Sequence, residues 1–172
     1  MDQLWAPWRM SYITNVDNHD EGCIFCTKPT QGRDRENLIL FRGKYTFVLM
    51  NLFPYNNGHL MVIPYQHTSD MLDLPPETSA EMWENLCHCK KALSAACRPD
   101  AFNIGMNIGR TAGAGIDQHV HMHIVPRWNG DTNFMPVIGK TKVISQGIDE
   151  TWESLRPYFI SIEGTAAEEP SS

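Results

Sequence analysis

The chain has no long hydrophobic run and no excess of positive charge. No segment approaches the ~20 consecutive apolar residues that a membrane-spanning helix needs, and residues 1–20 lack the continuous apolar core of a secretory signal. Its 14 Lys and Arg are outnumbered by 20 Asp and Glu, which gives a formal net charge of -6 and argues against nonspecific binding to a nucleic-acid polymer. We therefore expect a protein that binds neither membranes nor nucleic-acid polymers.

Cysteine is present in an odd number and without the spacing of a disulfide framework. Five cysteines in 172 residues suit a reducing compartment, so we expect a cytoplasmic location. The length predicts one domain, which we place at residues 1–162. Residues 163–172 are acidic and rich in small side chains, and we expect them to form a disordered tail.

Three histidines occupy alternate positions, His119, His121 and His123, with an apolar residue after each. This alternation predicts a β-strand that places the three imidazoles on one face, about 6.6 Å apart, and buries the other face. Such a row of imidazoles fits either a metal site or a site for nucleophilic and acid-base chemistry. A strand whose histidine rings are merely hydrogen-bonded is the structural alternative.

A second pair of metal-ligating residues lies near the start of the chain, where Cys23 and Cys26 are separated by two residues. This spacing can direct both thiolates at one tetrahedral ion. Two further ligands are needed, and His67, after an apolar run, and His119 could complete a closed structural zinc site. A redox-active pair is the alternative, but a loop follows Cys26 instead of the helix typical of a thioredoxin-like motif. Zinc at these four residues would leave His121 and His123 for chemistry.

The order of apolar runs predicts an α+β fold. We expect one long helix between the third and fourth of about five strands, and the short connections favour an antiparallel sheet. The expected strands span residues 38–41, 45–50, 60–64, 102–106 and 120–125.

Several of these motifs together resemble those of the histidine triad (HIT) superfamily of nucleotide hydrolases and transferases. The histidine row is similar to the motif that gives the superfamily its name. Four further segments resemble its branch of diadenosine tetraphosphate (Ap4A) phosphorylases: residues 4–10, the Cys-x-x-Cys pair, residues 58–64 and residues 125–128. The resemblance covers about residues 3–160. It implies a HIT-like fold and a homodimer with one continuous sheet.

The resemblance also implies a two-step nucleotidyl transfer. The middle histidine, His121, would attack the phosphorus joined to the nucleoside, and the resulting nucleotidyl-histidine would pass its nucleotide to phosphate or to water. His123 would lie beside the substrate phosphate, where it could donate a hydrogen bond or protonate the leaving group. Imidazole suits this role because its ordinary pKa of about 6.5 leaves much of it neutral near pH 7.

Further contacts with the nucleotide follow from the same resemblance. Some relatives carry a Ser or Gln where this chain has Gly115, so no side-chain donor is expected there. His59 matches a histidine near the nucleoside pocket, and we do not assign it a catalytic role. The binding residues implied are Asn51 at the ribose, Asn107 at the phosphates, the backbone of Ala114 and Gly115 over the phosphates, and Trp128 at a phosphate or base. Without the resemblance, Asn51 fits a turn and the glycine-rich loop fits a hairpin connection.

The sequence thus favours a zinc-stabilised nucleotidyl transferase that cleaves dinucleoside polyphosphates, Ap4A first among them, with phosphate as acceptor. A hydrolase that uses water on dinucleoside polyphosphates, nucleoside phosphoramidates or adenylyl sulfate would need the same residues. The sequence is also compatible with a non-catalytic nucleotide-binding module and with a metallo-hydrolase that holds a catalytic ion on all three histidines.

Overall fold

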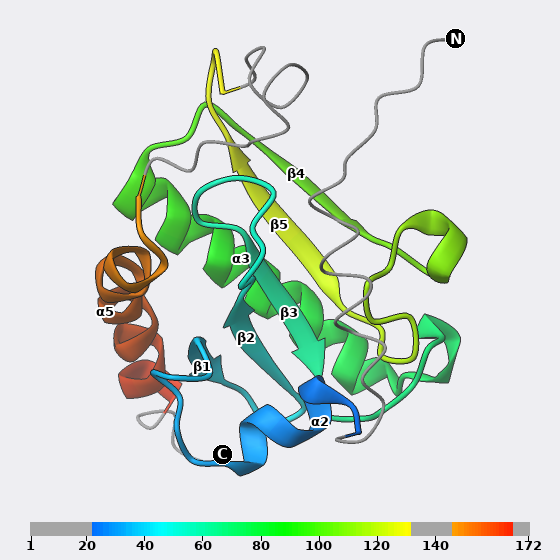
Figure 1. Ribbon diagram of the computed structural model, residues 1–172. Coiled ribbons are helices and arrows are strands. Elements are labelled where there is room, and N and C mark those ends of the chain that lie inside the picture. The colour runs from blue at the N-terminus through cyan, green and yellow to red at the C-terminus, as the bar shows by residue number, and fades with distance from the viewer. Residues whose placement is uncertain (1–21, 132–145, 167–172) are drawn as a thin grey trace, which may run out of the picture.

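The computed structural model describes residues 22–131 and 146–166 (Figure 1). The segment 4–10 and residues 167–172 of the expected tail lie outside the described residues. The longer elements are five strands and two helices: β1 (Ile39–Arg42), β2 (Thr46–Met50), β3 (Leu60–Pro64), α3 (Pro76–Cys97), β4 (Ala101–Met106), β5 (Met122–Arg127) and α5 (Ile148–Ala166). The shorter helices are α2 (Ile24–Thr27), η2 (Lys28–Thr30), η3 (Met71–Asp73) and η4 (Arg110–Ala112).

The strands form one five-stranded antiparallel sheet in the order β1-β2-β3-β5-β4. Every residue of β2 and β3 is buried, which explains why all of them except Thr46 are apolar. β4, at the end of the order, has mostly exposed residues. The α+β fold with an antiparallel sheet is therefore confirmed, and all five expected strands are present within two residues of their predicted limits.

The long helix α3 covers one face of the sheet and lies behind it in Figure 1. Its buried residues Met82, Leu86, Cys89 and Leu93 recur every three or four positions, so they form one apolar stripe. This stripe packs on β2, β3 and β5. None of the helices in the two described ranges is long and apolar enough to cross a membrane.

A second long helix, α5, is absent from the sequence prediction, which had a single long helix. It packs against α3 and β1, and its residues Thr151, Leu155 and Phe159 are almost completely buried. The helix continues to Ala166, so the first four residues of the segment expected to be a tail belong to it.

The histidine row is only partly a strand, because β5 begins at Met122 and not at residue 120. The β3–β5 ladder ends where Val62 pairs with Met122. Beyond this pair, the Val120 N–H donates to the Thr68 carbonyl, and the Pro64 carbonyl accepts from the ring of His119. The His119 ring and the loop at Thr68 thus supply the hydrogen bonds that strand pairing would otherwise make. His119 and His121 precede β5, the strand that contains His123.

Candidate active site and metal centre

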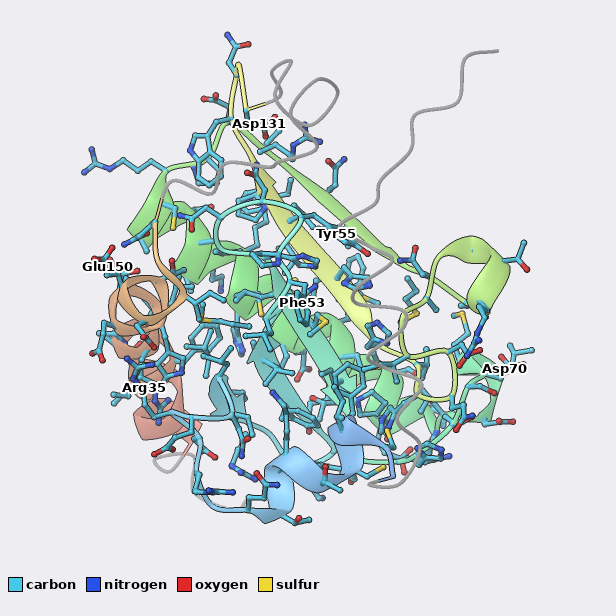
Figure 2. The ribbon with its side chains drawn as sticks, in the orientation of Figure 1. Arg35, Phe53, Tyr55, Asp70, Asp131 and Glu150 are labelled. Atoms are coloured by element: carbon cyan, nitrogen blue, oxygen red, sulfur yellow. The ribbon has the colours of Figure 1, made fainter. Side chains whose placement is uncertain are left out.

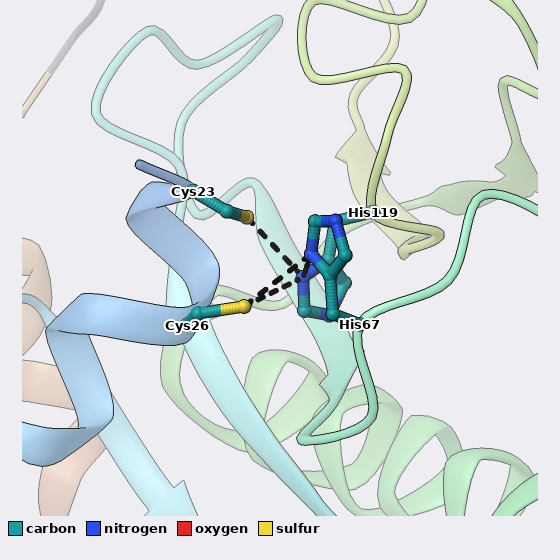
Figure 3. Close-up of side chains that lie close together, drawn as sticks. All are labelled: Cys23, Cys26, His67 and His119. Atoms are coloured by element: carbon teal, nitrogen blue, oxygen red, sulfur yellow. Dashed lines mark hydrogen bonds between the residues drawn. The ribbon is translucent and has the colours of Figure 1, made fainter. Parts of the chain in front are cut away.

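The ring of His119 is held by the end of β3. Its Nε2 lies 2.9 Å from the Pro64 carbonyl, and because a carbonyl only accepts, Nε2 carries the proton and the Nδ1 lone pair is left for another partner. Nδ1 lies 3.3 Å from Cys23 Sγ, 3.6 Å from Cys26 Sγ and 3.3 Å from His67 Nδ1 (Figure 3).

The four predicted ligands are close enough for one tetrahedral ion. With Zn–S bonds of about 2.3 Å and Zn–N bonds of about 2.0 Å, the ligand atoms of a tetrahedral site lie about 3.3 to 3.8 Å apart. The three distances from His119 Nδ1 agree with this range, as does the 3.4 Å from Cys26 Sγ to His67 Nδ1. All the ligand atoms lie within 4.8 Å of one another. The cluster of Cys23, Cys26, His67 and His119 can therefore bind a metal ion.

The short helix α2 brings the two thiols to the same side. Cys23 is its N-cap residue, and its carbonyl accepts from the N–H of both Cys26 and Thr27. One helical turn therefore separates the two cysteines, so both Sγ atoms face the imidazoles in Figure 3.

The electrostatics of the cluster favour the uncharged forms of its side chains. Burial raises the pKa of the Cys26 thiol to about 11, and the neighbouring Cys23 adds to the shift. Burial also lowers the pKa of His119, against the hydrogen bond to Pro64, which raises it. Both effects oppose charge in the protein alone, whereas a bound cation stabilises thiolates and neutral imidazoles.

His121 is buried, with 5% of its surface exposed, and its tautomer is set by the backbone. Nδ1 lies 2.8 Å from the His119 carbonyl, so Nδ1 carries the proton and Nε2 holds the lone pair. Within the described part of the chain, no hydrogen bond occupies Nε2. Burial lowers the pKa of His121 and the bond to the His119 carbonyl raises it, with burial dominant. A neutral imidazole with its lone pair on Nε2 is a competent nucleophile.

His123 takes the opposite tautomer because of His59. The Tyr55 backbone N–H donates to His59 Nδ1 at 3.1 Å, and the Asn51 side-chain amide lies 3.2 Å from the same atom. Since a backbone N–H cannot accept, His59 carries its proton on Nε2, which donates to His123 Nδ1 at 2.9 Å. His123 in its neutral form therefore carries its proton on Nε2 and is a donor there.

The structure brings some of the predicted nucleotide-binding residues to these histidines and leaves others apart. Asn51 reaches the site through His59, and its Oδ1 also accepts from the Phe53 N–H. Asn107 follows β4, whose last residue pairs with Met122, so continuing the register places it opposite His121. Trp128 follows the other end of β5, where its backbone N–H donates to Asp131, about 23 Å along the chain from His121.

Ala114 and Gly115 lie in the loop between η4 and the histidines. Ala114 is buried and its N–H donates to the Gly109 carbonyl. Gly109 and Gly113 have φ values of 82° and 93°, which only glycine adopts readily. The loop that contains Ala114 and Gly115 connects the end of β4, through η4, to His119.

Two aromatic residues of the site were missed from the sequence. Tyr55 lies in the loop between β2 and β3 (Figure 2), and its ring centroid is 4.6 Å from that of His59 and 5.7 Å from that of His123. Phe25, between the two cysteines, contacts His119 and His121. The one available signal was their position, since Phe25 is flanked by a predicted ligand and Tyr55 lies shortly before the Gly-His pair that precedes β3.

Comparison with known proteins identifies relatives of this chain. Residues 33–130 match the family model described as "HIT domain". A Mycobacterium tuberculosis protein named AP-4-A phosphorylase is 38% identical over 157 residues, which are 88% of this chain and 80% of that protein. A Saccharomyces cerevisiae protein named adenosine 5'-monophosphoramidase is 29% identical over 63% of this chain and 64% of its own length.

Solved structures show the same fold. The crystal structure of a Zn-bound histidine triad family protein from Mycobacterium smegmatis superimposes with a TM-score of 0.66 at 26% identity. The match covers 84% of this chain and 97% of that chain. Sequence and fold comparisons thus lead to the same group of proteins.

Proposed function

Because this chain belongs to the HIT domain family, we propose that it is a nucleotidyl transferase that cleaves dinucleoside polyphosphates, Ap4A in the first place, with phosphate as acceptor. The observation that carries the proposal is the hydrogen bond from His121 Nδ1 to the His119 carbonyl, which keeps the lone pair on Nε2. The name of the M. tuberculosis relative supports the substrate and the acceptor.

The first step forms a bond between His121 Nε2 and the phosphorus attached to one adenosine. The bond from that phosphorus to the bridging oxygen breaks, and ATP leaves with its electron pair. His123, protonated on Nε2 and 4.7 Å from the His121 ring between centroids, donates a hydrogen bond to the phosphate oxygens on which negative charge accumulates. Asn107, opposite His121 in the register, and the backbone of Ala114 and Gly115 contact the phosphates.

In the second step an oxygen of inorganic phosphate attacks the same phosphorus. The P–N bond breaks, His121 recovers its neutral form with the lone pair on Nε2, and ADP is released. Asn51 contacts the ribose with the part of its amide that His59 does not use.

We propose zinc as the ion of the Cys23, Cys26, His67 and His119 cluster, because two thiolates and two imidazoles are a donor set typical of structural zinc. When bound, zinc cross-links α2, the segment after β3 and the segment before β5. The donor geometry argues against a catalytic ion on all three triad histidines, since His119 Nδ1 points to the cysteines while His121 and His123 take no part in the cluster. An intact nucleophile likewise argues against a purely binding module.

A hydrolase or phosphoramidase is the second candidate function. The S. cerevisiae relative named adenosine 5'-monophosphoramidase supports it, and the same His121 and His123 would serve with water as acceptor. Product analysis separates the two functions. A phosphorylase converts Ap4A to ADP and ATP only when phosphate is present, whereas a hydrolase gives AMP and ATP without phosphate.

The assembly and location follow as further parts of the proposal. β4 is an edge strand with Ile104 47% exposed, and pairing with β4 of a second copy would continue the sheet in a homodimer. None of the five cysteines, all of which lie in the described residues, forms a disulfide, and a cytoplasmic location would keep them reduced.

A further inference from the structure

Phe25 occupies the position between the metal cluster and the nucleophile. Two residues separate Cys23 from Cys26, and Phe25 is the buried one of the two, with 2% of its surface exposed. Its ring centroid lies 5.5 Å from that of His119 with the planes at 88°, and 5.0 Å from that of His121 with the planes at 62°. Both are edge-on contacts, which aromatic rings prefer to face-to-face stacking.

Two connections therefore run from the metal cluster to His121. The first is through the backbone, since His119 offers Nδ1 to the cluster and its carbonyl to His121 Nδ1. The second is through Phe25, whose backbone belongs to α2. This helix has only four residues, too few to hold its place through its own hydrogen bonds, so the Phe25 ring is held by its packing in the hydrophobic core and by the contacts of Cys23 and Cys26 with the imidazoles.

The hydrogen bond to the His119 carbonyl fixes the tautomer of His121 but leaves one degree of freedom. The imidazole can still tilt through small coupled changes of χ1 and χ2 that keep the bond from Nδ1 to the carbonyl oxygen, and this tilt displaces Nε2, the reacting atom. A ring packed edge-on against the imidazole opposes that tilt.

We propose that Phe25 is a positioning residue for nucleotidyl transfer: its ring holds the His121 imidazole at the angle from which Nε2 reaches the phosphorus, and it does so from a helix that the metal cluster fixes. The inference rests on the proposed function, because it takes His121 to be the nucleophile. Phe25 touches no substrate in this account, so its loss should slow the chemical step and leave substrate binding in place.

The test compares Phe25→Leu and Phe25→Tyr with wild type, all loaded with zinc. Ile24→Ala is the matched control, since Ile24 is on the same helix and 44% exposed. With Ap4A and phosphate, we expect kcat of Phe25→Leu to fall about tenfold, the fold-change that corresponds to loss of a strong aromatic contact. KM and the zinc content should stay within about twofold of wild type. Phe25→Tyr, which keeps the ring, should recover most of the rate, and Ile24→Ala should match wild type.

A second measurement does not depend on turnover. In NMR spectra of the zinc-loaded protein, the ring signals of His121 should shift or broaden in Phe25→Leu, while those of His88 on α3 stay in place. A Phe25→Leu variant with wild-type kcat and unchanged His121 signals overturns the inference. Loss of zinc from that variant also overturns it, because Phe25 would then act on the metal site alone. If wild type does not turn over, or His121→Ala does, the proposed function fails, and the NMR comparison still decides whether Phe25 orients the ring.

Discussion

His59 decides which nitrogen of His123 carries a proton, although it lies 64 positions away in the sequence and is only 1% exposed. The donors from Tyr55 and Asn51 leave it a single neutral tautomer, and that tautomer makes His123 a donor at Nε2. His59→Ala removes this constraint, so His123 can place its proton on Nδ1. We expect kcat for Ap4A cleavage to fall about tenfold or more, with a smaller change in KM.

Steady-state kinetics with His88→Ala as control check this prediction. His88 is a partly buried histidine on α3 outside the site, so its replacement should leave both constants near wild type. Equal kcat values for His59→Ala and wild type would show that His123 needs no partner at Nδ1.

For single residues, the sequence predicts which side chains are candidates for the site better than it predicts which residues they contact. The four residues predicted as metal ligands do lie together, and they could be picked out because they are chemically distinctive and lie in short motifs. The His59–His123 bond and the contact of Phe25 with His121 join segments that are far apart in the sequence. No local periodicity encodes such contacts, so they emerge only from the folded chain.

Helix α2 is held by contacts outside its own four residues, among them those of Cys23 and Cys26 with the two imidazoles. Cys23→Ser removes one thiolate, and we expect the bound metal to fall from one ion per chain to a small fraction of that. The melting temperature should drop by more than about 5 °C, because a structural metal contributes directly to folding stability. Elemental analysis and thermal melts measure both quantities, with the exposed Cys87→Ser as control. Unchanged metal content in Cys23→Ser would contradict the assignment.

The turn between β1 and β2 is attached to α3 by one carboxylate. Glu81 accepts from the backbone N–H groups of Lys44, Tyr45 and Thr46 and from the Thr46 hydroxyl. It also packs so closely on Gly43 that a Cβ there would collide with the carboxylate. Glu81→Ala leaves these donors without their acceptor, so the free energy of unfolding should fall by about 1–3 kcal/mol.

Urea denaturation measures this loss, and Glu84→Ala, an exposed carboxylate on the same helix, serves as control with a change of less than about 0.5 kcal/mol. The turn lies next to the end of β3, where Thr46 pairs with Pro64 and the Pro64 carbonyl in turn bonds to His119. Activity per folded molecule is therefore measured alongside stability. A Glu81→Ala variant as stable as wild type would show that water satisfies the turn equally well.

Among the elements, the strands were easier to predict than α5. The strands are short apolar runs between turn residues, and β3 was predicted at its observed limits. In α5 the buried residues recur at every fourth position, but Pro157 lies inside the helix and obscures the pattern because proline usually ends a helix. The start of β5 was predicted two residues early, since alternation alone does not reveal that Pro64 bonds to a side chain.

For the whole molecule, the sheet order leaves β4 at an edge with Ile104 exposed. We expect a homodimer, and Ile104→Lys should convert it to a monomer because a charge on an edge strand opposes strand pairing. Light scattering after gel filtration measures the mass. Ile160→Lys on α5, at a similarly exposed residue, should remain dimeric. A wild-type mass equal to one chain would contradict the proposed assembly.

The central claim for the molecule is a covalent nucleotidyl group on His121. The most direct test is to mix the protein with Ap4A without phosphate, quench within one turnover, and measure the intact mass and the modified peptide. We predict that wild type gains one AMP unit on His121, that added phosphate discharges it as ADP, and that His121→Ala gains none. An adduct on another residue would contradict this claim. So would wild-type turnover without any adduct, if His121→Ala is also active.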